Sequence, residues 1–125
     1  MHEFSASKQI VDGVLEEAEK HNAKKVLEVH LIIGKFTFLN VEQIKFWYEA
    51  LTKDTIMEKS TLHIEQEDIA VQCDNCGYEG QIKLEEKDVE HHHYITPTLS
   101  CPRCGSPVYI IKGKECTVKT IKFAV

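Results

Sequence analysis

Two stretches of this chain have apolar residues at helical spacing, and each predicts a helix. Over residues 5–21 apolar residues recur every three or four positions, which predicts an amphipathic helix with Ser5 or Ser7 as its cap. A second helix is expected from Asn40, because Asn40 followed by Gln43 resembles a capping box and leads into another apolar face. Both helices should bury one side against a shared core.

Other segments have the composition of strands. Residues 26–34 are rich in branched apolar residues and end on Gly34, and residues 61–71 alternate between apolar and polar positions. Residues 107–111 and 115–124 have strand-like composition again. The chain therefore reads as an α+β domain over residues 1–70 and 107–125.

The intervening residues, 71–106, carry two Cys-x-x-Cys-Gly units and no long periodic segment. Each unit directs two thiolates at one centre, and the glycine after the second cysteine permits a tight turn with positive φ. Four thiolates around one ion make a closed tetrahedral site, so we expect a zinc-ribbon domain with structural Zn²⁺. The expected zinc ligands are Cys73, Cys76, Cys101 and Cys104. Iron in a rubredoxin-like site uses the same geometry, whereas a redox dithiol needs only one such unit.

Bulk composition narrows the class of protein. The chain has 125 residues, 42% of them hydrophobic, which suits one domain carrying a small subdomain. No secretory signal and no bilayer-length apolar run are visible, so we expect a soluble cytoplasmic protein with reduced thiols and no membrane partner. The net charge is −5, and residues 71–106 hold six acidic against three basic side chains. This balance argues against nucleic acid as a partner. The fifth cysteine, Cys116, is interpreted as a small buried apolar residue.

The first three residues form a possible chelate. Met1, His2 and Glu3 place an α-amine, backbone amides and an imidazole in sequence, with a carboxylate available from Glu3. Nickel(II) favours nitrogen donors in square-planar or tetragonal geometry, so these residues are candidate nickel ligands. The alternative is that His2 is simply a solvated side chain.

The opening Met1-His2-Glu3-Phe4-Ser5 followed later by two cysteine knuckles resembles the HypA (HybF) family of nickel chaperones for [NiFe]-hydrogenase maturation. The resemblance implies nickel bound as cargo through Met1, His2 and Glu3. It implies structural zinc on the four cysteines, and a three-stranded antiparallel sheet packed on two helices with the ribbon inserted before the last strand. It also implies a HypB-type GTPase and the hydrogenase large subunit as partners, with urease a further client of some relatives.

Two positions bear on the nickel site that this resemblance implies. Where some relatives have an aspartate, this chain has Asn40, a poorer ligand that suits a helix cap. In archaeal relatives a loop histidine before an aromatic residue can join the nickel shell, and His93 before Tyr94 is the best match, ahead of His91 and His92.

The remaining histidines and the motifs of known enzyme classes bear on other functions. His21, His30 and His63 are interpreted as surface or strand-edge residues. No P-loop, dinucleotide fingerprint or nucleophile elbow occurs, so we expect no enzyme. The alternative to a nickel chaperone is a zinc-ribbon adaptor that binds a protein and carries no nickel.

Overall fold

The structure is a computed structural model that describes residues 2–82 and 99–125. The chain divides into two compact units. The first unit comprises residues 1–33, 39–66 and 116–125, and the second comprises residues 34–38 and 67–115. The second unit thus extends beyond residues 71–106 on both sides.

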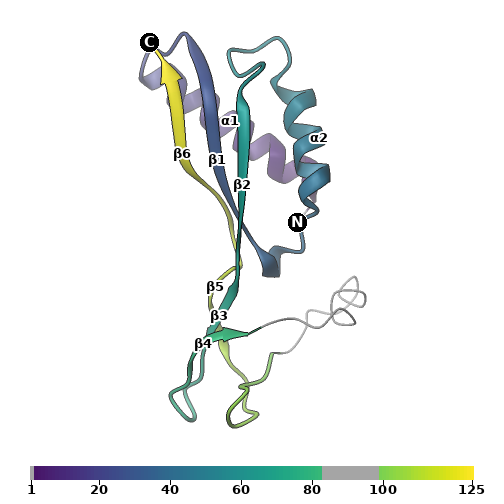
Figure 1. Ribbon diagram of the computed structural model, residues 1–125, viewed down its shortest axis with the longest axis vertical. Helices are drawn as coiled ribbons and strands as arrows, with labels where there is room; N and C mark the ends of the chain where they lie inside the picture. Colours follow the sequence, from purple (N-terminus) through teal and green to yellow (C-terminus); the bar gives the residue numbers. More distant parts are fainter. Residues whose placement is uncertain (1, 83–98) are drawn as a thin grey trace. The chain divides into compact units, whose positions relative to one another are not determined.

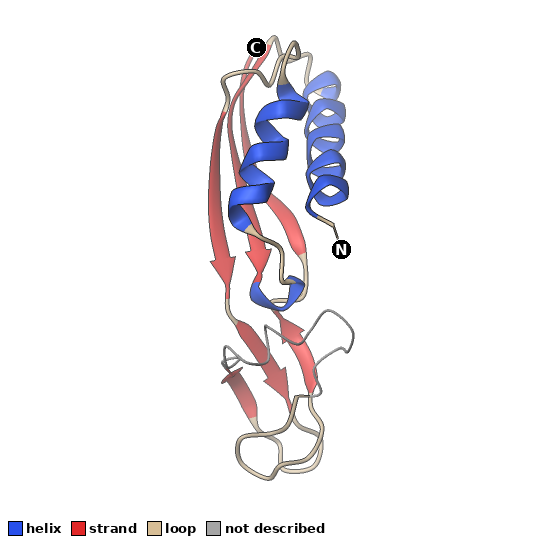
Figure 2. Cartoon of the chain, turned by 90° about the vertical axis from the view of Figure 1, so that its right-hand side faces the viewer, coloured by secondary structure: helices blue, strands red, loops and turns tan. Residues whose placement is uncertain are grey.

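The first unit contains two helices and a three-stranded sheet (Figure 1). The helices are α1 (Glu3–Lys20) and α2 (Val41–Thr52). The strands, in sheet order, are β2 (Thr61–Glu67), β1 (Lys25–Gly34) and β6 (Cys116–Ala124), where β1 and β2 each end at the boundary with the second unit. Both helices lie on the same face of this sheet (Figure 2). The expected α+β fold, with a ribbon inserted before the last strand, is confirmed.

The direction of β2 departs from a wholly antiparallel sheet. Strand β6 pairs antiparallel to β1, with Val29 opposite Ile121 and Ile33 opposite Cys116. Strands β1 and β2 run in the same direction (Figure 1). The reason lies in the connection, because α2 separates the two strands in sequence and a helical crossover is the usual link between parallel neighbours.

Burial against the helices accounts for the stability of this unit. The core cluster consists of apolar side chains from α1, β1, α2 and the adjoining loops, with Val14 of α1 and Leu31 of β1 each 1% exposed. In β1, Val29, Leu31 and Ile33 are buried while the residues between them are partly exposed, as strand alternation requires. One face of the sheet therefore packs on the helices and the other meets solvent.

The second unit holds a separate antiparallel sheet, in the order β4 (Glu79–Ile82), β3 (Ile69–Gln72) and β5 (Tyr109–Lys112), together with the short 3-10 helix η1 (Lys35–Thr37). The single strand expected over residues 61–71 is wrong, because the chain breaks at Asp68 and β2 and β3 join different sheets. The alternation of residues 61–67 gives way to the buried apolar run Ile69, Ala70 and Val71, and this change of pattern is the local sign of the break.

The expected start of the first helix also needs correction. Helix α1 begins at Glu3, and His2 rather than a serine is its N-cap, with no hydrogen bond from its side chain. Ser7 is fully buried and directs its hydroxyl at the Ile44 carbonyl oxygen, 3.5 Å away, so it bridges the two helices instead of capping one. By contrast, the Asn40 cap of α2 is confirmed, since its side chain accepts a 2.9 Å hydrogen bond from the Gln43 amide.

Candidate metal centres

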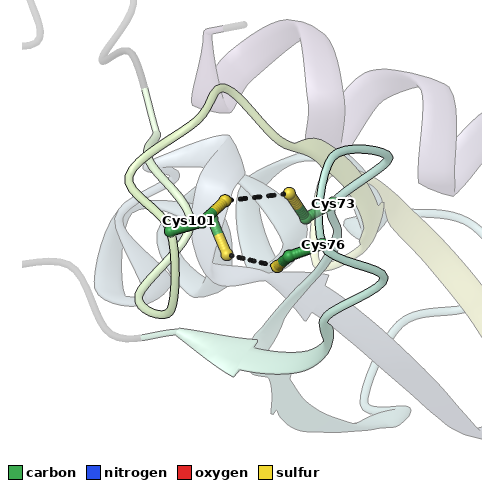
Figure 3. A group of neighbouring side chains, drawn as sticks. Cys73, Cys76 and Cys101 are labelled. Carbon is green, nitrogen blue, oxygen red and sulfur yellow. Dashed lines mark hydrogen bonds between the residues drawn. The ribbon is translucent and has the colours of Figure 1, made fainter.

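The four cysteines of the two knuckles come together in the second unit. Cys73 and Cys76 lie between β3 and β4, and Cys101 and Cys104 lie in the turn before β5. All four sulfur atoms lie within 4.8 Å of one another. Figure 3 shows the Cys73, Cys76 and Cys101 side chains converging from the two turns.

The two turns share one backbone design. In the first, the Gly77 amide donates to the Cys73 carbonyl at 2.9 Å; in the second, the Gly105 amide donates to the Cys101 carbonyl at 2.8 Å. Both glycines have positive φ, +78° and +79°, as their place after the second cysteine predicts. A side chain at either position would strain the turn, so glycine allows both thiols of each pair to face the same point.

The sulfur positions fit a tetrahedral ion. The Cys73 and Cys104 sulfurs are 3.6 Å apart, and the Cys76 and Cys101 sulfurs are 3.5 Å apart. Zinc–thiolate bonds of about 2.3 Å give a tetrahedron whose edges are about 3.8 Å, so little movement would be needed. Four soft sulfur donors suit zinc, and their number leaves no open coordination position.

Protonation within the cluster is uneven. The Tyr78 backbone amide lowers the pKa of Cys76, but burial and the neighbouring sulfurs outweigh it and raise that pKa to about 12. Hydrogen bonds from the Asn75 side chain and from Ser106 lower the pKa of Cys104 to about 5. An ion bound by four thiolates must displace the remaining protons, so its binding should weaken in acid.

The N-terminal motif lies at the start of α1, in the first unit. His2 is exposed, and its carbonyl accepts the first helical hydrogen bond from the Ala6 amide at 2.9 Å. The earlier amides of a helix have no partner within it, and those of His2 and Glu3 belong to this group. Met1 lies outside the described residues, as does His93.

Glu3 connects the beginnings of the two helices. Its carboxylate accepts a 3.2 Å hydrogen bond from the Asn40 backbone amide, while the Asn40 side chain caps α2. In a capping box the residue three positions on would supply that acceptor; here a residue from another helix supplies it. The sequence pattern did not predict this contact, because its partners are 37 positions apart.

An aromatic cluster adjoins this end of α1. Phe4 and Phe46 are 46% and 59% exposed, and each packs edge-to-face on Trp47, with ring centroids 4.9 and 5.0 Å apart. Phe4 and Phe46 were not among the candidate binding residues expected from the sequence. Their signal was two large apolar residues, Phe4 and Phe46, at helix positions outside the buried stripe.

Two further features complete the candidate chemistry. Cys116 is partly buried against the core, and burial raises the pKa of its thiol, in keeping with the apolar role expected for it. A third group of potential ligands, Glu28, His30 and His63, occurs on the first unit's sheet. Both histidines were expected at the surface or a strand edge, but nothing in their sequence positions predicted that they would meet. None of the helices in the described residues could span a membrane.

Comparison with known proteins agrees with these observations. A family model described as "Hydrogenase/urease nickel incorporation, metallochaperone, hypA" matches residues 1–123. The hydrogenase maturation factor HypA of Methanothermobacter thermautotrophicus is 40% identical over 123 residues, covering 98% of this chain and 96% of the relative. The HypA of Pyrococcus horikoshii is 37% identical over 132 residues, with 98% and 95% covered.

Solved structures support the same fold. The solution structure of the nickel metallochaperone HypA from Helicobacter pylori matches with a TM-score of 0.68, covering 99% of this chain and 98% of that one. A second solution structure of a HypA protein matches with a TM-score of 0.69. Each is 20% identical in sequence to this chain, so these matches show the fold alone.

Proposed function

Since this chain belongs to the HypA family of nickel metallochaperones, we propose that it binds one Ni²⁺ at the start of α1 and delivers it, with a HypB-type GTPase, to the large subunit of [NiFe]-hydrogenase. The metal is cargo and the chain is a carrier rather than an enzyme. The proposed ligands are Met1, His2 and Glu3. The observation that carries this proposal is the position of His2 and Glu3 at the start of α1, on an exposed helix end whose first amides have no partner within the helix.

The helix end supplies nitrogen donors without loss of structure. Deprotonating an amide inside a helix would break a hydrogen bond, whereas the amides of His2 and Glu3 have none to lose within α1. The Met1 amine, the two amide nitrogens and the His2 ring would together provide four nitrogens. The His2 amide nitrogen chelates with each of the other three, so the set suits nickel in a six-coordinate, tetragonal shell rather than a square plane. The amidate charges would also offset the positive end of the helix dipole.

The Glu3 carboxylate has a separate role in this scheme. It already accepts a hydrogen bond from the Asn40 amide, so we assign the Glu3 backbone nitrogen, not its side chain, to the metal. The carboxylate then acts as a positioning group that holds the start of α1 against α2. Asn40 remains a helix cap and contributes no ligand.

The four cysteines, in this proposal, hold Zn²⁺ as a structural ion. Their spacing and number fit it, and the closed sulfur shell would keep this ion from exchanging with the cargo. His93 stays a candidate additional nickel ligand by resemblance alone, because it lies outside the described residues.

The aromatic cluster of Phe4, Phe46 and Trp47 supports a protein partner docked beside the cargo. Exposed aromatic side chains are enriched at protein interfaces, and Phe4 immediately follows the proposed ligands in sequence. We assign this cluster to the GTPase. Phe46→Ser should weaken binding of the GTPase while leaving nickel affinity unchanged, and Ile56→Ser, at another exposed apolar residue, is the matched control.

The decisive experiment blocks the amino end. Calorimetric titration of the untagged, zinc-loaded protein with Ni²⁺ should show a tight site at the amino end, and both His2→Ala and two added residues before Met1 should abolish this site. His21→Ala, at an exposed histidine elsewhere on α1's C-cap, should leave it intact. Equal nickel binding by the extended and native chains would contradict the proposal and favour a zinc-ribbon adaptor without nickel.

A further inference from the structure

A cluster of potential metal ligands occurs on the solvent face of the first unit's sheet. Glu28 and His30 alternate along β1 with the buried residues Val29 and Leu31, so strand geometry turns their side chains away from the helices. His63 lies on the neighbouring strand β2 between two half-buried residues, on the same solvent face. One oxygen and two ring nitrogens, one from each residue, lie within 4.8 Å of one another.

The side chains are already arranged as a group. The His63 Nε2 atom lies 2.9 Å from Glu28 Oε1, and the His30 and His63 rings stack with centroids 4.3 Å apart and planes 15° apart. Two ligands on one octahedral ion, with bonds of about 2.1 Å, stand about 3.0 Å apart, which the first pair nearly matches. The other ligand distances are at most 4.8 Å and would shorten to about 3.0 Å when an ion binds.

We propose that Glu28, His30 and His63 form an additional binding site for a divalent transition-metal ion, separate from the N-terminal and cysteine sites. Two imidazoles and one carboxylate suit nickel, zinc or copper, and disfavour magnesium, which prefers oxygen ligands. Three protein ligands leave open positions that water fills, so the ion is exchangeable.

The surroundings provide room but also a competing charge. A hollow of about 400 Å³ beside His30 and His63 can hold the ion and its water ligands. Lys122 lies 3.8 Å from the second carboxylate oxygen of Glu28 and opposes a cation there. Because the lysine is largely exposed, water screens this repulsion, and the site should be of moderate affinity.

A simple ion pair is the other use of the same residues. Glu28 and His63 alone would form such a pair, and His21 with Glu17, 3.5 Å apart, is an example on α1. The α1 pair lacks a second imidazole, whereas His30 adds a third donor to the β1–β2 group. His21 is therefore a matched control for a histidine that has an acidic neighbour but no chelate.

The test removes the other candidate donors first. The full-length, zinc-loaded chain should carry His2→Ala, His91→Ala, His92→Ala and His93→Ala. Titration of this protein with Ni²⁺ should show one remaining site, and Mg²⁺ should not compete. Octahedral Ni²⁺ is paramagnetic, so the ring NMR signals of His30 and His63 should broaden while those of His21 stay sharp.

Substitutions then assign the donors. His63→Asn should weaken this binding roughly 10- to 100-fold or more, since even outer partners of metal ligands have effects of that size. Glu28→Gln should weaken it without removing either ring, and His21→Asn should not change it. Unbroadened His30 and His63 signals, or equal affinity in the parent, His63→Asn and Glu28→Gln proteins, would overturn the proposal. An amide NMR spectrum shows that each variant is folded.

Discussion

Different interactions stabilise the two units of this protein. Every member of the hydrophobic core cluster, from Ala6 to Met57, belongs to the first unit, which contains the two helices. In the second unit, which contains the zinc ribbon, the buried apolar residues among those the structure describes are Ile69, Ala70 and Val71 of β3 together with two of the cysteines. A few buried side chains stabilise a fold only weakly, so the ribbon depends on its metal while the other unit depends on packing.

The same contrast separates the cysteine site from the proposed N-terminal site. The cysteine site is closed, with four side chains held by paired backbone turns, and it suits a permanent ion. The N-terminal site would be open, built largely from main-chain nitrogen at an exposed helix end, and it suits an ion that must leave. Retention and release thus follow from donor type and exposure.

Loss of a ribbon thiol should have the largest effect. Cys101→Ser should reduce bound zinc from about one ion per chain to almost none and unfold the ribbon, because metal binding contributes on the order of 10 kcal/mol to folds of this kind. Zinc analysis and amide NMR would measure both, with helix signals preserved. Cys116→Ser, outside the cluster, is the control and should retain zinc. A folded ribbon without metal would refute the contrast.

A cavity in the core should come next in size. Leu31→Ala, at a side chain that is 1% exposed, should lower the free energy of unfolding of the first unit by roughly 2–5 kcal/mol, as buried leucines do. Urea unfolding followed by helix circular dichroism would measure it. Ile111→Ala, at a 40% exposed side chain in the ribbon, should change stability far less. Similar losses in both variants would show that packing stabilises the two units alike.

A smaller effect is expected at the junction of the helices. Asn40→Ala removes the side chain that caps α2 and should cost about 1 kcal/mol of stability. Its nickel affinity should stay close to that of the parent, because the Asn40 backbone amide that holds Glu3 is still present. Nickel titration of this variant measures its affinity, and urea unfolding of the same variant measures its stability. A large loss of nickel affinity at unchanged stability would mean that the Asn40 side chain is itself a ligand.

The smallest effect concerns alkaline pH. Burial raises the pKa of Tyr48 above its ordinary value of 10.0, although a hydrogen bond with Ser60, 2.6 Å long, partly opposes this. Folding then favours the protonated phenol, so its contribution is present below pH 10 and is lost as the pH rises through the folded pKa. Ultraviolet titration of the phenol should show late ionisation. Tyr48→Phe should lose stability less steeply above pH 10, and an equal slope would disprove this assignment.

Local patterns predicted much of this architecture. The helical period located α1 and α2, the Asn40 and Gln43 pattern placed a cap correctly, and Gly77 and Gly105 mark turns with the expected positive φ. Spacing also anticipated which four cysteines would meet. These features depend on residues a few positions apart, or on the Cys-x-x-Cys-Gly unit, whose sequence specifies its turn.

Contacts between distant residues could not be predicted in this way. The change from alternation in residues 61–67 to an apolar run at 69–71 is local, but it does not tell which neighbours pair with each piece or that the two pieces join different sheets. The parallel course of β1 and β2 likewise follows from how the chain crosses over through α2.

By itself, the sequence determined the kinds of donor in this protein: four thiolates in two identical turns, and an imidazole near the amino end. Tertiary structure alone decided which other groups stand beside them. It set the Glu3 carboxylate on the Asn40 amide and brought Glu28 and His30 within reach of His63. The physical reason is that chain neighbours share local geometry, whereas groups some 35 residues apart meet only where packing and strand pairing bring them together.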